Sequence, residues 1–243
     1  MQPISRLFSS TFVKFWSNWQ LFFLIYFVAG VWSALEAFAE PDLDTAIISS
    51  GEWAVYLAAL AIASVFSVLM SISLTYAMAG TATSVKGAYS MALRNFWRYL
   101  ILAVVSVVIV TVGFLFLIVP GIVLSVWFVF AYFVLLLENE GVIASLKKSR
   151  EYVRGHWWGV FARIAVFFLI MAGIVFALQL LITFIVSFLP AVLLAQIVYV
   201  LLTLFVAGFL TPFSLLYFYQ MYLELKSGKE LSYDSFQTAQ STV

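Results

Sequence analysis

Residues 99–119 read YLILAVVSVVIVTVGFLFLIV, a stretch without one charged side chain. A helix needs about 20 consecutive apolar residues to cross the hydrocarbon core of a bilayer. A membrane β-strand would instead alternate apolar and polar residues, and residues 104–110 show no such alternation. The stretch therefore predicts a membrane-spanning helix.

The composition of the whole chain agrees with this stretch. Of its 243 residues, 65% are hydrophobic and 9% are charged. Soluble domains are about 45–50% apolar and about 25% charged. A soluble fold of this length could not bury so much apolar surface, so lipid is the expected solvent. No polar linker divides the chain, and we expect one domain over residues 1–226 with a short polar tail at 227–243.

Further apolar stretches predict an all-α protein with six spans. The expected spans are residues 19–39, 53–80, 99–119, 122–137, 157–189 and 191–223. We expect Pro120 and Gly121 to form a tight turn, with glycine supplying backbone freedom. Pro190 is expected in the last short turn, and Pro212 is expected to kink the sixth span.

The basic residues predict the orientation. All twelve lysines and arginines fall in the N-terminus, the second and fourth loops or just beyond them, and the C-terminus. The first loop instead carries Glu40, Asp42 and Asp44. Positive residues remain on the cytoplasmic side. Both termini are therefore expected in the cytoplasm, in a multi-pass protein of the cell membrane.

The N-terminus has a second interpretation as a signal peptide. Arg6 and Lys14 precede an apolar run, and Ala37-Phe38-Ala39 resembles a cleavage site. The run 19–39 is longer than a usual signal segment. An uncleaved first helix is therefore the favoured prediction.

Three segments share one plan. Residues 4–19, 85–98 and 142–158 each combine an amphipathic stretch, a basic residue and an aromatic cluster, followed by two spans. Amphipathic helices of this kind lie in the headgroup plane, and tryptophans anchor the next span at the interface. The pattern predicts three helical hairpins, each preceded by a cytoplasmic interfacial helix.

Few polar residues lie at membrane depth. Glu36 and Arg163 are expected to reach the nearer interface, and Gln179 and Gln196 to hydrogen-bond across the last two spans. A polar substrate site at the two glutamines is the alternative. The lack of a charged residue near mid-membrane argues against ion-coupled transport.

The segment after the fourth span is the candidate site. Glu138 begins it, and a basic helix follows whose apolar residues Val142, Leu146, Val153 and Trp157 are expected to face the membrane. One interpretation is an interfacial helix held by anionic lipid. The other is a site for a lipid headgroup or phosphate, with Glu138 holding an arginine; its contacts would be Arg94, Arg150, Arg154, Trp157 and Trp158.

Several classes of chemistry lack their residues. The chain has no cysteine and one histidine, His156, which excludes thiolate chemistry and multi-histidine metal sites. We identify no nucleophile motif or phosphate loop. The net charge of +1 argues against a nucleic-acid partner. We expect no catalytic residue, cofactor or metal.

Residues 117–163 resemble a known family. The pattern is Leu117-Ile118-Val119-Pro120-Gly121-Ile122, then Leu137-Glu138, then ASLKKSR at 144–150 and VRGHWW at 153–158. It resembles the membrane domain of the glycerophosphoryl diester phosphodiesterase membrane-domain family, which also stands alone in bacterial and archaeal membrane proteins. The matching positions are Pro120, Gly121, Glu138, Ser149 and Gly155.

The resemblance implies a membrane domain and no activity. In fused members a separate soluble, metal-dependent barrel performs catalysis, and we expect none in this chain. On physical grounds, Ser149 is expected to bond to a nearby carbonyl and Gly155 to allow a bend.

The expected function is non-catalytic: organising or sensing lipid, or scaffolding a partner. The alternatives are a transporter or scramblase of a lipidic substrate and, third, a membrane-embedded lipid-metabolising enzyme. Expected partners are anionic membrane lipids; a second copy of the chain and another membrane protein stay open.

Overall fold

The computed structural model describes the backbone of residues 3–39, 50–190 and 192–241, and the side chains of residues 3–34, 51–190 and 194–228. Within these residues the secondary structure is helical, without a strand. The helices are α1 (Ile4–Ala39), α2 (Ser50–Met78), α3 (Val85–Phe116), α4 (Ile118–Phe128), α5 (Ala131–Leu137), α6 (Val142–Val153), α7 (Trp157–Val186) and α8 (Val192–Ser241).

The chain divides into two compact units. Unit 1 comprises Met1–Ser17, Asn95–Phe167 and Ser214–Val243. Unit 2 comprises Asn18–Arg94 and Phe168–Phe213. The helices α1, α3, α7 and α8 each contribute to both units.

Among the residues that the structure describes, five helical segments are long and apolar enough to cross a membrane. They are Gly51–Met78, Val85–Phe116, Ile118–Leu137, Trp157–Val186 and Leu194–Gly228. These segments confirm the expected class, a polytopic all-α membrane protein. The first expected span, 19–39, lies within α1, and its last side chains, Glu36 included, are outside the described residues. A sixth span therefore stays a prediction, and so does the acidic first loop.

Two of the three expected interfacial helices are separated from the span that follows them by a change in backbone conformation. Asn18 has φ −134° and ψ 17°, which interrupts the helical geometry of α1. Gly155 has φ +88°, a left-handed conformation that glycine adopts without strain, and it separates α6 from α7. The bend predicted at Gly155 is confirmed. The second expected interfacial helix, residues 85–98, is in contrast continuous with its span, because both lie in α3.

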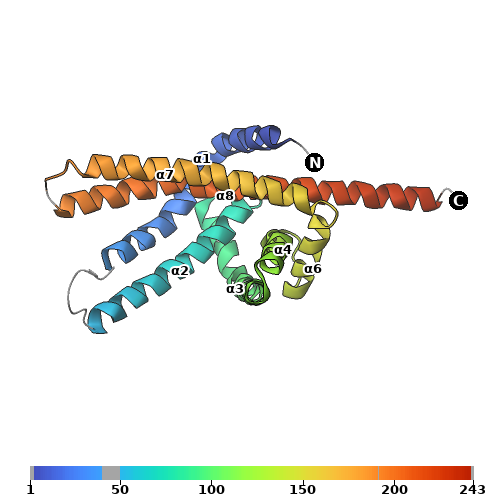
Figure 1. Ribbon diagram of the computed structural model, residues 1–243, viewed down its shortest axis with the longest axis horizontal. Coiled ribbons are helices and arrows are strands. Elements are labelled where there is room, and N and C mark those ends of the chain that lie inside the picture. The colour runs from blue at the N-terminus through green and yellow to red at the C-terminus, as the bar shows by residue number, and fades with distance from the viewer. Residues whose placement is uncertain (1–2, 40–49, 191, 242–243) are drawn as a thin grey trace. The chain divides into compact units, whose positions relative to one another are not determined.

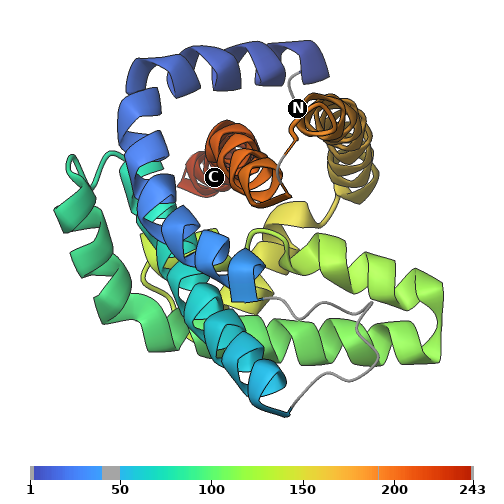
Figure 2. The same ribbon diagram turned by 90° about the vertical axis from the view of Figure 1, so that its left-hand side faces the viewer.

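The turn predicted at Pro120 and Gly121 is wrong. The helix α3 ends at Phe116, and Leu117 alone is extended, with φ −165° and ψ 153°. Pro120 and Gly121 lie inside the first turns of α4. Proline fits there because the first helical turn needs no amide donor from it. The connection is thus shorter than expected, and α3 and α4 lie side by side after it (Figure 2).

Gly113 and Gly121 let α3 and α4 approach closely. A Cβ atom at Gly113 would lie 3.2 Å from the Cα of Gly121 and 2.7 Å from Cδ1 of Leu124. A Cβ at Gly121 would overlap the ring of Phe114. Small residues serve this purpose in membranes, where no hydrophobic force draws helices together.

Gly121→Ala is expected to destabilise the α3–α4 pair by about 1–3 kcal/mol, because the new methyl group overpacks the Phe114 ring. The matched control is Gly173→Ala in α7, where an added Cβ has no neighbour within 4 Å. Unfolding of both variants in the same detergent would measure the difference. Equal stability of the two would contradict the packing role given to Gly121.

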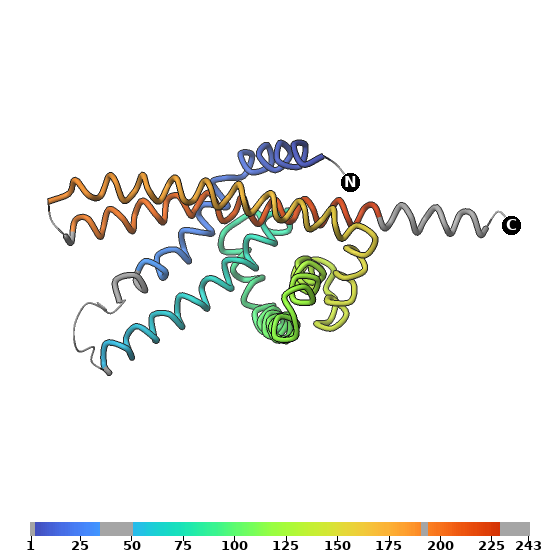
Figure 3. Tube along the Cα trace, in the orientation of Figure 1, coloured from blue at the N-terminus to red at the C-terminus, as the bar shows by residue number. Residues whose placement is uncertain are grey.

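The core of unit 1 is aromatic. The ring of Tyr217 in α8 stacks on Phe167 at a centroid distance of 4.2 Å. Phe133 of α5 stacks on Tyr222 of α8 at 5.2 Å. All four residues are almost fully buried. These contacts fix α5 and the N-terminal part of α7 on α8, and α6 follows α5 along the trace (Figure 3).

Ring contacts and hydrogen bonds join the helices of unit 2. Trp32 of α1 stacks on Phe66 of α2 at 4.7 Å. The hydroxyl of Tyr89 donates to the carbonyl of Ile25 at 2.8 Å. Gln179 Nε2 donates to the hydroxyl of Tyr199 at 2.5 Å. This last bond joins α7 and α8, which run side by side (Figure 1).

The pairing predicted between Gln179 and Gln196 is therefore wrong. Gln196 is exposed, and the partner of Gln179 lies three residues further along α8. A shift of three residues is almost one helical turn, which explains why a count from the Pro190 turn missed it.

The prolines of the last two helices behave differently. Pro190 lies between α7 and α8, as predicted. Pro212 lies inside α8 without ending it. The backbone of α8 continues as a helix to Ser241, through the segment expected to be a short polar tail.

Candidate functional site

Glu138 is the centre of a polar cluster in unit 1. It follows α5 as its C-cap, and its side chain is 8% exposed. Lys148 Nζ of α6 lies 2.5 Å from its Oε2. The hydroxyls of Tyr152 and Tyr222 donate to its Oε1 at 2.9 Å and 2.5 Å. Lys226 Nζ is 3.8 Å from the same oxygen.

This cluster corrects the predicted role of Glu138. The carboxylate holds a lysine, Lys148, and not an arginine. Lys148 also lies 3.0 Å from Glu140, so one ammonium group bridges two carboxylates. Three helices meet at Glu138, because its partners come from α6 and α8 while it ends α5.

The loop between α5 and α6 is held by Arg98. Asn139 has φ +55°, a left-handed conformation that asparagine tolerates better than most residues. Arg98 Nη1 donates to Asn139 Oδ1 at 2.5 Å, and Nη2 donates to the carbonyl of Glu140 at 2.8 Å. The guanidinium group of Arg98, in α3, therefore fixes the loop that directly follows Glu138.

The helix α6 packs on protein with its apolar face. Leu146 is 5% exposed and Val153 is fully buried, and α6 contacts α4 and α5 (Figure 1). The expectation that this face turns to the membrane is wrong for these two residues. Ser149 Oγ donates to the carbonyl of Trp127 at 2.6 Å, which confirms the bond predicted for Ser149.

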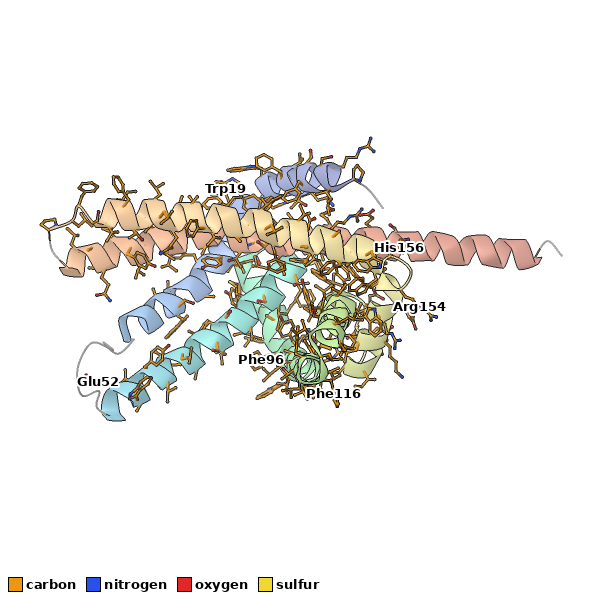
Figure 4. All side chains as sticks on the ribbon, in the orientation of Figure 1. Trp19, Glu52, Phe96, Phe116, Arg154 and His156 are labelled. Carbon is orange, nitrogen blue, oxygen red and sulfur yellow. The ribbon has the colours of Figure 1, made fainter. Side chains whose placement is uncertain are left out.

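The opposite face of α6 is basic and exposed. Lys147, Arg150 and Arg154 are all exposed. The guanidinium carbon of Arg150 lies 4.2 Å from the centroid of the Trp127 ring, a cation–π contact. Arg154 lies at the end of α6, and His156 follows at the elbow before α7 (Figure 4).

The predicted headgroup contacts are only partly brought together. Arg150 and Arg154 lie on one helix, and Trp157 and Trp158 begin the next. Trp157 stacks on Phe161 at 5.1 Å, whereas Trp158 is 76% exposed. A surface hollow of about 430 Å³ follows residues 155–159. Arg94 is exposed and belongs to unit 2.

The predicted position of Arg163 is also wrong. Instead of reaching the interface, Arg163 is 5% exposed, and its Nη1 lies 3.0 Å from Glu224 Oε2 of α8. The hydroxyl of Tyr217 donates to its carbonyl at 3.4 Å. A buried ion pair thus joins α7 to α8 inside unit 1.

The electrostatics of Glu138 favour its charged form. Burial by itself would raise the pKa of the carboxyl group. Hydrogen bonds from Lys148, Tyr222 and Tyr152, with the charge of Lys226, outweigh burial and hold the pKa below its ordinary value of 4.5. The hydrogen bond to Glu138 in turn raises the pKa of Lys148.

Acid is therefore expected to destabilise unit 1. A carboxyl group with a lowered folded-state pKa stabilises the fold above its unfolded pKa, and this contribution disappears as the pH falls through the folded value. We expect the melting temperature to fall as the pH drops below about 4.5. Glu138→Gln should lose this part of the acid dependence. An unchanged acid profile in that variant would contradict the role given to Glu138.

The partners of Glu138 that sequence reasoning missed are Lys148, Tyr152, Tyr222 and Lys226, and it also missed Arg98 at the neighbouring loop. One signal could have found Tyr152: it follows Lys148 by four residues, so the two share a face of α6. Nothing local indicates Tyr222, which lies 84 residues from Glu138.

The cluster holds the ends of three helices together. Its carboxylate is engaged by four donors from α6 and α8. Within the residues whose side chains are described, no group of three histidines or carboxylates could hold a metal ion. The exposed charged groups of α6 are Lys147, Arg150 and Arg154, with one acidic residue, Glu151, among them, and the three cations can attract anions.

A separate groove lies between α3, α4 and α5 in unit 1. It has a volume of about 370 Å³ and a mainly apolar lining. The polar groups of its lining are hydroxyls, those of Tyr99, Ser106, Thr111, Ser125 and Tyr132. An acyl chain could make apolar contacts in this groove, whose lining residues carry no charge.

Comparisons with protein families, curated proteins and solved structures found no match to this chain.

Proposed function

We propose that this chain is a non-catalytic integral membrane protein that organises anionic lipid at its cytoplasmic surface through the basic face of α6. The single observation that carries the proposal is the two-sided build of α6. One face is locked to α4, α5 and α8 through Leu146, Ser149 and Tyr152. The other presents Lys147, Arg150 and Arg154 outward.

The rigid mounting of α6 matters for lipid binding. A basic residue near an anionic membrane surface contributes about 1 kcal/mol of attraction. A free helix would lose conformational entropy when it becomes ordered on the membrane, and this cost would offset part of the attraction. A helix that is already packed on the protein does not have this cost. Three cations on one exposed face, with the exposed ring of Trp158 at the next elbow, suit a surface that lies among headgroups.

The proposed topology has six spans in three hairpins, with both termini and α6 in the cytoplasm of a cell membrane. The five apolar helical segments supply most of these spans. The positions of the lysines and arginines support the orientation, since they fall on alternate loops. The family resemblance at Pro120, Gly121, Glu138, Ser149 and Gly155 belongs to this proposal too.

The double variant Lys147→Gln/Arg154→Gln tests the lipid role. The full chain is placed in nanodiscs of phosphatidylcholine and phosphatidylglycerol, and the lipids that it retains are measured by mass spectrometry. Loss of two cations is expected to weaken phosphatidylglycerol binding by about 2 kcal/mol, or about 30-fold. Arg150 is left intact because its variant would also remove the contact with Trp127.

The matched control is Lys86→Gln/Arg94→Gln, which removes two exposed cations of unit 2. A much smaller loss in the control is expected. Equal retention in both double variants and in the original chain would refute the proposal. An equal loss in both would refute the special role of α6.

A second function is favoured by the groove between α3, α4 and α5: a scramblase or transporter of a lipidic substrate. The groove has the apolar lining that an acyl chain needs, and hydroxyls on α3, α4 and α5. In proteoliposomes a labelled phospholipid would then change leaflets faster than in empty vesicles. No rate above empty vesicles would remove this alternative.

A further inference from the structure

The groove between α3, α4 and α5 has a defined length and a closed end. The residues of α3 that line it recur every three or four positions from Tyr99 to Thr111, so the groove follows one face of that helix. At 1.5 Å per residue this face is about 18 Å long. Beyond it, α3 and α4 approach closely at Gly113 and Gly121. The groove is thus about as long as one leaflet, since the whole hydrocarbon core is about 30 Å thick.

The second wall of the groove is a broken helix. The segment Ile118–Leu137 is long enough for one span, yet α4 ends at Phe128 and α5 begins at Ala131. Residues on both sides of this break line the groove. Non-helical backbone within a span occurs where it is buried in protein or lines a cavity, and broken helices in membrane transporters form binding sites. The break therefore favours a binding site over an incidental gap between two helices.

The hydroxyl of Tyr132 needs a partner from outside the chain. Tyr132 lines the groove and is partly exposed, and its hydroxyl makes no hydrogen bond to the residues that the structure describes. A serine or threonine on a helix can turn to a carbonyl of the preceding turn, as Ser125 does to Ile122 at 2.8 Å. The rigid ring of tyrosine does not allow this. A hydroxyl in apolar surroundings costs free energy unless it is bonded, so a ligand oxygen is expected at Tyr132.

The lining restricts the chemistry of the ligand. Its volume of about 370 Å³ is that of a small-molecule site, and none of its residues is charged. An ionised group at membrane depth would therefore lack a counter-charge here. Tyr132 precedes Glu138, the cap of α5, by about 9 Å along the helix. In the proposed topology this is the cytoplasmic end of the span, where the ester carbonyls of phospholipids lie between the headgroups and the chains.

We propose that the groove binds one acyl chain of a phospholipid from the cytoplasmic leaflet, with the hydroxyl of Tyr132 donating to the ester carbonyl of that chain. The chain lies along α3 and ends where Gly113 and Gly121 close the helix pair. Because the groove ends at this contact, it holds a lipid in place within one leaflet.

The inference rests on the proposed topology for the choice of leaflet, but it is independent of the role proposed for α6. None of the residues that line the groove belongs to α6. The double variant Lys147→Gln/Arg154→Gln should therefore keep the lipid of the groove. If that variant kept this lipid and also kept its phosphatidylglycerol, the role of α6 alone would be refuted.

The carbonyl contact is tested with two lipids that differ in one group. The full chain in detergent is equilibrated with equal amounts of ester-linked and ether-linked phosphatidylcholine of the same chain length, and native mass spectrometry reads the lipid retained. We expect one lipid per chain, with the ester form favoured about fivefold, which corresponds to about 1 kcal/mol for one neutral hydrogen bond. Tyr132→Phe removes only the hydroxyl and should abolish the preference.

Filling the groove tests the position of the chain. Ala103 lines the groove, and Ala103→Phe places a ring where the acyl chain would lie. The matched control is Val104→Phe, at a neighbouring position of α3 that is 55% exposed and does not line the groove. Ala103→Phe should retain either lipid at least about tenfold less well, whereas the control should retain it like the original chain. Melting temperatures check the fold of each variant, and Tyr132→Phe still tests the proposal if Ala103→Phe does not fold.

Four results would overturn the proposal. The first is equal retention of ester and ether lipid by the original chain, or a preference that Tyr132→Phe keeps. The second is retention that a folded Ala103→Phe leaves unchanged. The third is a dimer without bound lipid that Ala103→Phe dissociates, which would assign the groove to a helix of a second copy. The fourth is translocation of lipid in proteoliposomes that Ala103→Phe abolishes, which would assign the groove to transport.

Discussion

Arg163→Ala is expected to lower the free energy of unfolding by about 3–5 kcal/mol. The guanidinium is almost completely buried and lies 3.0 Å from Glu224, which is itself 16% exposed. Removing the arginine takes away the guanidinium that pairs with the partly buried Glu224 carboxylate. Removing one partner of a buried pair is costly for this reason, even where the intact pair adds little.

The double variant Arg163→Met/Glu224→Leu should recover much of that loss, since no buried charge is left unpaired. Arg154→Ala, at an exposed position of α6, should change stability by less than about 0.5 kcal/mol. Unfolding of all three in one detergent would provide the comparison. A double variant as unstable as Arg163→Ala would mean that the pair itself, rather than the unpaired charge, determines stability.

Glu138→Ala should produce the second large loss, of about 3 kcal/mol, at the lower end of the range for broken pairs because Lys148 is 35% exposed. The change leaves Lys148 with Glu140 alone and removes the acceptor of the hydroxyls of Tyr152 and Tyr222. Since these partners come from α6 and α8, we expect both helices to loosen from α5. Faster hydrogen exchange in α6 would measure this directly.

Glu140→Ala is the matched control for Glu138→Ala. Glu140 also pairs with Lys148, at 3.0 Å, but its side chain is 37% exposed. Exposed pairs contribute about 0–1 kcal/mol. If the two alanine variants were equally stable, burial of Glu138 would not be the source of its effect.

The sequence determined the class of the fold because apolar length is a local property. Runs such as residues 99–119 need no knowledge of their neighbours to predict a helix in lipid. Gly155 and Ser149 were predictable for a similar reason, since a left-handed backbone or a short hydroxyl bond follows from the residue type.

The errors arose where a long-range partner decides the outcome. Leu146 and Val153 were expected on lipid, yet α4 and α5 bury them. Lipid and the protein interior are both apolar, so a hydrophobic face does not distinguish between them. Arg163 was expected at the interface because no partner is visible near it in the sequence. Its actual partner, Glu224, lies 61 residues away in the chain.

The turn at Leu117 was missed for a different reason. A Pro-Gly pair is a common turn signal, but proline is also favoured in the first turn of a helix. The close approach of Gly113 to Gly121 requires the second arrangement. Sequence spacing alone contains no information about that approach.

The account as a whole depends on all the lysines and arginines lying on one side of the membrane. The chain has no cysteine, so a single introduced cysteine is its only thiol. Ser5→Cys, Lys147→Cys and Ser187→Cys, each treated on intact cells with a membrane-impermeant maleimide, give the most direct test. Labelling of Ser187→Cys alone, with the other two labelled only after the membrane is opened, is the predicted result. Labelling of Ser5→Cys or Lys147→Cys from outside would contradict the account.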